Sequence, residues 1–362
     1  MQIEQGMKRF LSRTFVRQVI FVSALVGLLI VAAHLWPTAQ YALPVKAGDL
    51  KPASELFAHD IRVFGGAKAY ARLSTALQGY LDEDQHAYAH AFGHELYKIE
   101  GEHGVSACGV DFGLGCFHQF LGDAITELGT DSAQRLYDSC TRVAGNQELC
   151  RHGLGHGILS GVGYAEKDLQ KALDVCGSIT REVTYAGCGG GVFMEYNLRT
   201  IANAEGIAGS RDVDSGGIYA PCESVHADNR QVCTFWLPEW WFFAVLKGNQ
   251  MQGSRSDVYA QMGELCAAST YPQTCYEGIG YFTPTAFGSN PAEIRAACDS
   301  AGERGGANAY CRGTAAIILQ STRETRELGP GMCDGLSGRP EMVCKQYVAH
   351  KGDFSFSSSE HL

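Results

Sequence analysis

Apolar and polar residues alternate along most of this chain with the period of amphipathic α-helices. The clearest example runs from Asp168 to Cys176, where Leu169, Ala172 and Leu173 share one helical face and charged residues occupy the other. Polar, turn-rich links such as Arg142 to Glu148 join segments of this kind. The pattern therefore predicts an all-α protein made of helix pairs.

The N-terminal 36 residues have a different pattern. Four basic residues precede a run of 18 residues, 19–36, that contains no formally charged side chain. This length is sufficient to cross a bilayer, and the basic flank is expected to stay in the cytoplasm. We therefore expect a cytoplasmic segment at 1–18, a transmembrane anchor at 19–36 and a body in the periplasm or extracellular space. A cleaved signal sequence is the alternative, and it delivers the body to the same side.

The rest of the chain is acidic. The first 36 residues carry four basic residues and one acid, so the formal charge of −10 for the whole chain leaves −13 for the remainder. Such a body repels nucleic acid and anionic membrane surfaces, which excludes nucleic acid as an expected partner. We expect a spacer at 37–52, a folded domain at 53–350 and a disordered tail at 351–362.

All 14 cysteines lie after residue 107, and they fall into close pairs separated by 8 to 13 residues. No pair is C-x-x-C, which argues against zinc knuckles, and an even number of regularly spaced cysteines indicates a disulfide framework in an oxidising compartment. Spacing alone does not fix the connectivity. The expected disulfides are Cys108–Cys116, Cys140–Cys150, Cys176–Cys188, Cys222–Cys233, Cys266–Cys275, Cys298–Cys311 and Cys333–Cys344.

The second cysteines of these pairs recur at intervals of 33 to 45 residues. This period is in the range of helical-hairpin repeats, which stack into solenoids. An amphipathic helix is expected before each first cysteine and another after each second cysteine. We therefore expect a right-handed superhelix of α/α hairpins, each clasped by one disulfide.

The stretch K-D-L-Q-K-A-L-D-V-C, with the C-G-G-G that follows a short link, resembles the cysteine-rich Sel1-like repeat proteins, which are TPR-like. Their α/α units of roughly 36 residues carry one cysteine late in the first helix and another early in the second. The resemblance covers about residues 60–350 and implies a concave surface that binds proteins or peptides. Histidine, glycine or acidic residues often replace the usual L-G and tyrosine positions here, which favours a more specialised role.

Alignment on the second cysteine places histidines in two repeated positions of three successive units. The first unit lacks the cysteine, and His86 lies one turn before its first histidine in an H-x3-H-x3-H pattern. Histidines four residues apart share a helical face and offer two nitrogens to one ion. The residues expected to bind metal on the concave face are His90, His94, His118, His152 and His156.

Carboxylates lie close to these histidines. Glu95 and Asp123 are expected either to bind the ion or to orient an imidazole from behind. The zinc-protease motif H-E-x-x-H is absent from the sequence. Imidazole and carboxylate ligands suit zinc, copper or iron. A metal-free histidine network and incidental structural histidines are the alternatives.

An aromatic stretch, Phe235 to Phe243, contains three of the four tryptophans. It is interpreted either as repeat core with a membrane contact or as the wall of a pocket for an apolar or cationic group. The residues expected to line such a pocket are Glu195, Trp236, Glu239, Trp240 and Glu277.

The glycines of the recurring C-x-x-G-x-G pattern are interpreted as packing devices that let helices approach closely, because no strand precedes them as a nucleotide-binding loop requires. The sequence thus favours a membrane-anchored, extracytoplasmic helical repeat protein with a histidine-rich metal site. Whether the protein is a metalloenzyme stays open, since no nucleophile and base are evident. The competing hypothesis is a metal-free scaffold that binds a protein or peptide.

Overall fold

The computed structural model describes residues 41, 43–44, 46–145, 147–181, 184–201, 209–211, 217–245, 254–302, 306–321 and 325–350. Every regular element in these residues is helical, which confirms the all-α class. The expected segments at 1–18, 19–36 and 351–362 lie outside the described residues, as does most of the expected spacer. Among the helices that are described, none combines the length and the apolar character needed to cross a bilayer.

The chain forms two compact units. The described residues of the first are 41, 43 and 72–78, and there the guanidinium of Arg72 lies over the ring of Tyr41 at 5.5 Å from its centroid. The second consists of 44–71 with 79–362 and contains all the disulfides. Helix α3 (Gly66–Ala76) contributes residues to both units.

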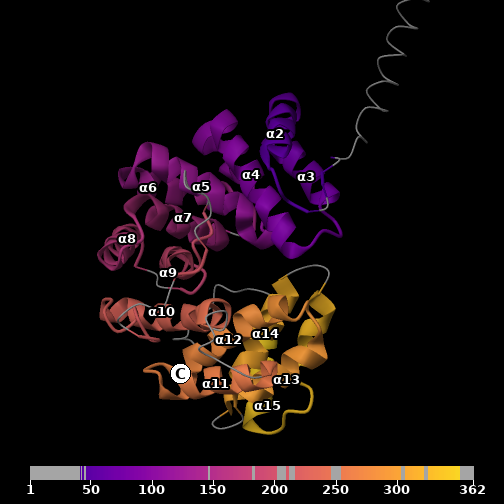
Figure 1. Cartoon of the computed structure of the whole chain (residues 1–362), viewed down its shortest axis with the longest axis vertical. Coiled ribbons are helices and arrows are strands. Elements are labelled where there is room, and N and C mark those ends of the chain that lie inside the picture. Colours follow the sequence, from indigo (N-terminus) through magenta and orange to yellow (C-terminus); the bar gives the residue numbers. More distant parts are fainter. Residues whose placement is uncertain are drawn as a thin grey trace, which may run out of the picture. The chain divides into compact units, whose positions relative to one another are not determined.

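The second unit is organised around a row of helices that pack against one another in chain order (Figure 1). Each contacts the next, and apart from α2 and α4 each carries the second cysteine of a pair within its first two turns. These helices are α2 (Lys51–Phe64), α4 (Asp82–Glu100), α5 (Gly115–Leu128), α7 (Gln147–Val162), α9 (Cys188–Leu198), α10 (Ala227–Trp240), α12 (Pro272–Ala286), α14 (Ala307–Ser321) and α15 (Arg339–Ala349).

A second set of helices packs on this row, and each either contains the first cysteine of a pair or ends directly before it. Contacts join α6 to α8 and α11 to α13, and α7 to α8 and α13 to α14. Their bounds are α6 (Ala133–Ser139), α8 (Glu166–Ile179), α11 (Arg255–Ala268) and α13 (Pro291–Ala301). The helix pairs expected from the hydrophobic pattern are thus present in these units.

The expectation of an amphipathic helix before every first cysteine is wrong in three units. Cys108 follows the 3-10 helix η2 (Gly101–Ala107), Cys333 ends the 3-10 helix η8 (Arg326–Cys333), and Cys222 lies in a turn. Two glycines in η2 and a Gly-Pro-Gly sequence in η8 explain the difference, because both residue types disfavour a regular α-helix.

Seven disulfides pair the fourteen cysteines in the order that the spacing indicated, with 8 to 13 residues between partners. Each connects the end of one segment to the helix that follows it. In the chain-entropy model, loops this short contribute about 2–3 kcal/mol each to the free energy of unfolding.

The glycines let neighbouring helices of the row approach until backbone meets backbone. At three equivalent positions, a Cβ added to the glycine would overlap the carbonyl oxygen of the second cysteine in the next unit. These positions are Gly93, Gly155 and Gly280. The interpretation of the glycines as packing devices is therefore confirmed.

Gly191 and Gly189 of α9 provide a matched test of this packing. A Cβ on Gly191 would overlap the carbonyl oxygen of His152 on α7, whereas a Cβ on Gly189 would meet only the Leu173 side chain at 4.0 Å. Gly191→Ala is expected to lower the free energy of unfolding by about 1–3 kcal/mol because α7 and α9 must separate. Gly189→Ala is expected to leave it unchanged or raise it by up to about 1 kcal/mol. Chemical denaturation measures both, and equal effects would contradict the close contact.

Candidate metal centre

Three neighbouring helices, α4, α5 and α7, direct imidazole side chains toward one another. His86 and His90 lie one turn apart on α4, His118 lies on α5, and His152 and His156 lie one turn apart on α7. We call these five side chains the imidazole cluster. His86 is partly exposed, whereas the other four are buried, with exposed fractions of 4% for His90, 1% for His118, 2% for His152 and 0% for His156. The cluster is therefore buried between helices rather than exposed at a surface.

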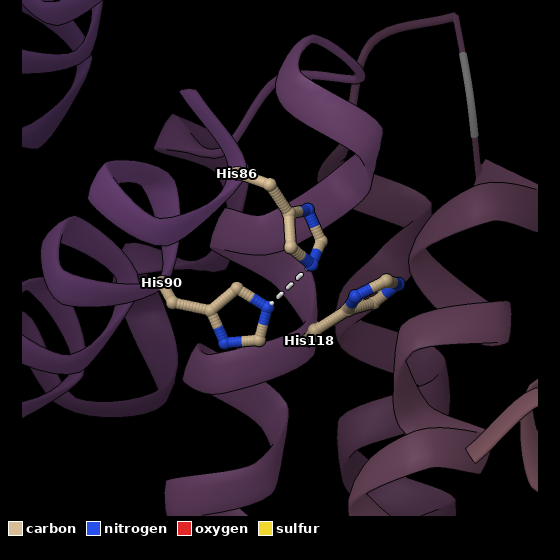
Figure 2. A group of neighbouring side chains, drawn as sticks. All are labelled: His86, His90 and His118. Atoms are coloured by element: carbon tan, nitrogen blue, oxygen red, sulfur yellow. Dashed lines mark hydrogen bonds between the residues drawn. The ribbon is translucent and has the colours of Figure 1, made fainter. Parts of the chain in front are cut away.

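The first group of the cluster consists of His86, His90 and His118. Each offers one ring nitrogen, and these atoms all lie within 4.8 Å of one another. The Nε2 atoms of His86 and His90 are 3.0 Å apart, and a ring nitrogen of His118 faces them (Figure 2). With metal to nitrogen bonds of about 2.0–2.1 Å and angles of about 90–110°, two ligand nitrogens stand about 2.9–3.4 Å apart. The observed separation lies within this range.

Hydrogen bonds on the outer side of the first group determine where its protons lie. Nδ1 of His86 donates to the carbonyl oxygen of Phe112 at 2.8 Å, since a carbonyl only accepts. Nδ1 of His90 donates to Oε1 of Gln119 at 3.1 Å, because Nε2 of this glutamine donates to Asp123 at 2.9 Å and so fixes the amide. A neutral imidazole has one N–H, so both Nε2 atoms are unprotonated. Two lone pairs then face each other at 3.0 Å, which is favourable only with a cation between them.

A strained turn supplies the Phe112 carbonyl. Phe112, Gly113 and Leu114 have φ values of 60°, 58° and 65°, in the left-handed region that residues other than glycine rarely adopt. For residues other than glycine, here Phe112 and Leu114, this conformation costs about 1–3 kcal/mol each and persists where the surroundings impose it. Here the turn brings its carbonyl oxygen to the outer nitrogen of His86.

The second group consists of His118, His152 and His156, with one nitrogen of each within 4.8 Å of the others. Nε2 of His152 and Nε2 of His156 are 3.1 Å apart. Nδ1 of His156 lies 2.9 Å from the carboxylate of Glu195 and donates to it. The rings of His118 and His156 are stacked, with centroids 4.0 Å apart and planes at 19°. Their nitrogens do not converge on one point until one ring turns.

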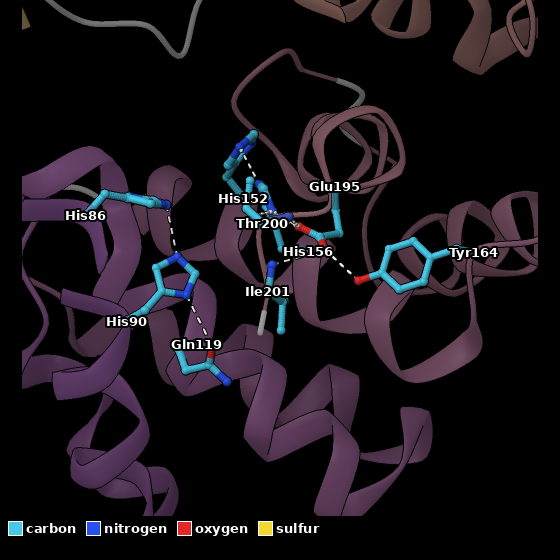
Figure 3. Close-up of polar contacts among 9 residues, drawn as sticks. All are labelled: His86, His90, Gln119, His152, His156, Tyr164, Glu195, Thr200 and Ile201. Atoms are coloured by element: carbon cyan, nitrogen blue, oxygen red, sulfur yellow. Dashed lines mark hydrogen bonds and ion pairs between the residues drawn. The ribbon is translucent and has the colours of Figure 1, made fainter. Parts of the chain in front are cut away.

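Glu195 is held by a dense set of donors behind His156 (Figure 3). It accepts from the hydroxyl of Tyr164 at 2.6 Å, from the hydroxyl and backbone N–H of Thr200 at 2.7 and 2.9 Å, and from the backbone N–H of Ile201 at 3.2 Å. Burial alone raises the pKa of this carboxyl, but the hydrogen bonds from His156, Tyr164 and Thr200 together hold the pKa below its ordinary value. A fully buried negative charge therefore lies directly behind the second group.

His118 lies between the two groups, and neither of its ring nitrogens has a hydrogen-bond partner in the described residues. Nδ1 of His152 also has no hydrogen-bond partner in the described residues. The backbone of Gly187 nevertheless lies near enough to oppose the lowering of the His152 pKa. A buried polar atom without a partner costs about 1–3 kcal/mol. These nitrogens are therefore costly in the protein alone.

Burial favours the neutral form of four of the five rings. Loss of solvation lowers the pKa of His86, and it lowers the pKa values of His90, His118 and His152 well below the ordinary value of 6.5. The neighbouring imidazoles lower them further. Neutral imidazole is the form that binds metal ions.

His94 was expected among the ligands, but it lies outside both groups. Its side chain is 46% exposed, and its Nδ1 is 2.7 Å from Asp123 on α5. The hydrogen bond to Asp123 raises the pKa of His94. Asp123 reaches the cluster only through Gln119 and His90, and Glu95 lies outside both groups, 3.7 Å from Lys98. His86, which the H-x3-H-x3-H pattern marks, takes the place of His94.

The aromatic residues and glutamates expected to line one open pocket are instead buried at separate contacts. The Trp236 ring packs beside His152 and Tyr281, with centroids 5.4 and 4.8 Å away. Trp240 donates to the carbonyl of Arg211 at 2.9 Å, and the guanidinium of this arginine lies 3.5 Å from the centre of its ring. The expectation of a shared, accessible pocket is thus wrong.

The two remaining glutamates of that set are also buried. Burial raises the pKa of Glu239 to about 8, so its carboxyl is largely protonated at neutral pH. Glu277 accepts hydrogen bonds from Tyr185 at 2.9 Å, from Gln273 at 3.0 Å and from Tyr347. Burial raises the pKa of Glu277, and its three donors satisfy it within the protein.

Comparisons with protein-family models, curated proteins and solved structures give no match for this chain. Its function is therefore inferred from the side chains themselves.

The lowered pKa values predict how the metal-free protein responds to acid. Below pH 6.5 the histidines of the unfolded chain bind protons that the buried histidines of the folded protein do not bind. The free energy of unfolding therefore decreases as the pH is lowered below 6.5. Each such histidine contributes up to about 1.4 kcal/mol per pH unit. His118→Gln is expected to make this dependence shallower, whereas His59→Gln, at an exposed position, is not. Denaturation midpoints between pH 5 and 8 measure the slope, and identical slopes for the wild type and His118→Gln would contradict the prediction.

Proposed function

We propose that this protein binds a transition metal ion at the imidazole cluster, through Nε2 of His86, Nε2 of His90 and a ring nitrogen of His118. The carrying observation is the pair of unprotonated Nε2 atoms 3.0 Å apart, whose outer nitrogens are both committed as donors. A cation between them turns a repulsive contact into two bonds. Burial disfavours a proton in this place, which leaves a metal ion as the better candidate.

The outer hydrogen bonds also support this proposal. Metal-binding histidines usually donate their other N–H to a carbonyl or carboxylate, which fixes the ring and raises its basicity. His86 has a backbone carbonyl in this role, His90 has the Gln119 and Asp123 relay, and His156 has Glu195. Imidazole nitrogens suit zinc, copper or iron, and the ligand type does not choose among them.

The burial of the cluster supports retention of an ion rather than turnover of a substrate. Structural metal sites are closed by protein ligands, whereas catalytic sites keep one position open to water or substrate. Of the five imidazoles only His86 is partly exposed, so it marks the side from which an ion enters. We therefore propose an ion that stabilises the packing of α4, α5 and α7, and we place the metalloenzyme hypothesis second.

We further propose that the described helices form a right-handed, Sel1-like superhelix held outside the cytoplasm by an N-terminal anchor at 19–36. Seven disulfides support an oxidising compartment, since thiols in the cytosol are kept reduced. The basic residues before position 19 support retention of the N-terminus on the cytoplasmic side.

Metal content tests the proposed function. The full chain, purified without a histidine tag, is expected to retain zinc, copper or iron after dialysis. His86→Gln with His90→Gln is expected to reduce the content by more than about fivefold, because two ligands are lost. His59→Gln with His103→Gln changes two exposed histidines and is the matched control, expected to have no effect. Less than about 0.2 ion per wild-type chain after incubation with each metal would contradict the proposal and favour a metal-free scaffold.

Thiol counting tests the proposed compartment. Cells that express the native chain are treated with a membrane-permeant alkylating reagent, and the purified protein is then denatured without reductant. No cysteine is expected to be alkylated, because all fourteen are paired. More than about two alkylated cysteines per chain would contradict residence in an oxidising compartment.

A further inference from the structure

His118 belongs to both groups of the imidazole cluster, which is unusual for a ligand of one ion. Its ring stands between the Nε2 pair of His86 and His90 and the pair of His152 and His156. The two pairs are related in sequence as well as in space. Each lies at spacing i, i+4 on a helix that packs directly on α5.

The hydrogen-bond state of His118 decides between one ion and two. Both ring nitrogens are buried, and neither has a partner in the described part of the chain. One ion satisfies one of them and leaves the other buried without a partner, at a cost typical of an unsatisfied polar group. An ion on each side satisfies both.

We propose that the cluster holds two metal ions bridged by the imidazole ring of His118. One ion is bound by His86, His90 and one nitrogen of His118, and the other by His152, His156 and the second nitrogen of His118. This inference rests on the proposed function and deepens it. Coordination at both nitrogens displaces the single N–H proton of His118 to solvent, so the bridging ring is an imidazolate with one negative charge.

The charges on either side of the cluster suit two cations. Asp123 lies behind the first group through Gln119 and His90, and Glu195 lies directly behind His156 in the second. Together with the imidazolate, these groups supply three negative charges in a buried site. Buried cations require compensation of this kind, because water is not there to solvate them.

The two ions are not equivalent. In the first group the His118 ring stands at 71° and 67° to the rings of His86 and His90, with its nitrogen turned toward theirs (Figure 2). In the second group it is stacked on His156, and one ring must turn before both bind the same ion. The site of His86 and His90 therefore fills first, and the second ion binds more weakly.

Copper is the probe that tests the bridge, because two Cu(II) ions joined by an imidazolate couple magnetically. The full-length, metal-free protein is titrated with Cu(II), total bound copper is measured, and the electron paramagnetic resonance signal is quantified. Two bound ions are expected, with a signal well below that of two isolated ions. Acid denaturation releases the ions and is expected to restore the full signal, which excludes reduction to Cu(I).

Variants assign the roles of the ligands. His118→Ala is expected to abolish the coupling, and His152→Gln with His156→Gln to remove the second ion while the first stays bound. His86→Gln with His90→Gln is expected to weaken the first binding step by more than about 100-fold. His94→Ala, on the same helix but outside both groups, is the control and is expected to retain two coupled ions. Circular dichroism establishes that each variant is folded.

The copper titration of the wild-type protein alone distinguishes the bridged pair of ions from the proposed single metal site. The test therefore stands even if His118→Ala fails to fold. Two ions with a reduced signal that acid restores support the bridge. One ion per chain, or two ions with a full signal, overturns the bridge and leaves the metal site standing. No bound ion overturns both the bridge and the proposed function.

Discussion

Four of the five imidazole rings packed between α4, α5 and α7 lack the solvent that normally satisfies their nitrogens. Each ring has two nitrogens, and each buried nitrogen needs a partner from the protein or from a bound ion. The protein supplies a partner on the outer side of His86, His90 and His156. In neutral His86 and His90 this partner takes the single N–H, which leaves the inner Nε2 atoms unprotonated. In the first group, the lone pairs of two Nε2 atoms then face each other at 3.0 Å.

Two features of the fold, the disulfides and the close helix contacts at glycines, fix the positions of the helices that carry the imidazole cluster. Disulfides of short loop length fix where each helix of the row begins, and glycines set how closely neighbouring helices approach. Gly191 touches the carbonyl of His152, so the helix that carries the second imidazole pair is positioned by backbone contact on that side. Side chains in such a frame have little freedom to relax, which makes an unsatisfied nitrogen persistent.

Much of the fold was readable from local features of the sequence. Cysteine spacing indicated the seven pairs, and the period of 3.6 residues indicated the helices, because both signals depend on neighbours along the chain. The α-helix predicted before each first cysteine is missing before Cys108, Cys222 and Cys333. There, glycine and proline disfavour an α-helix without changing the cysteine spacing. The handedness of a superhelix depends on how successive helix pairs rotate in space, which no local sequence pattern specifies. Membrane attachment depends on residues 19–36, which lie outside the described part of the chain.

The part of the imidazole cluster that depends on local spacing along the chain was also predicted. The i, i+4 pairs follow from helical geometry, so His90, His118, His152 and His156 were found by their repeat position. The choice of His86 over His94 depends on which turn of α4 faces His118 and which faces Asp123 across the helix contact, and no sequence period contains that information. Glu195 was noted for a different role, because its contact with His156 joins residues 39 apart.

The later units show that this architecture can satisfy a buried polar side chain without a ligand. Glu277 occupies the same repeat position as His118 and His152, two residues after the second cysteine, and it is equally buried. Three donors from the protein surround it, namely Tyr185, Gln273 and Tyr347. His118, by contrast, has four other imidazoles beside it, but neither of its ring nitrogens has a hydrogen-bond partner among the described residues. A fold that provides complete satisfaction for Glu277 but none for His118 favours a partner for His118 that is not part of the chain.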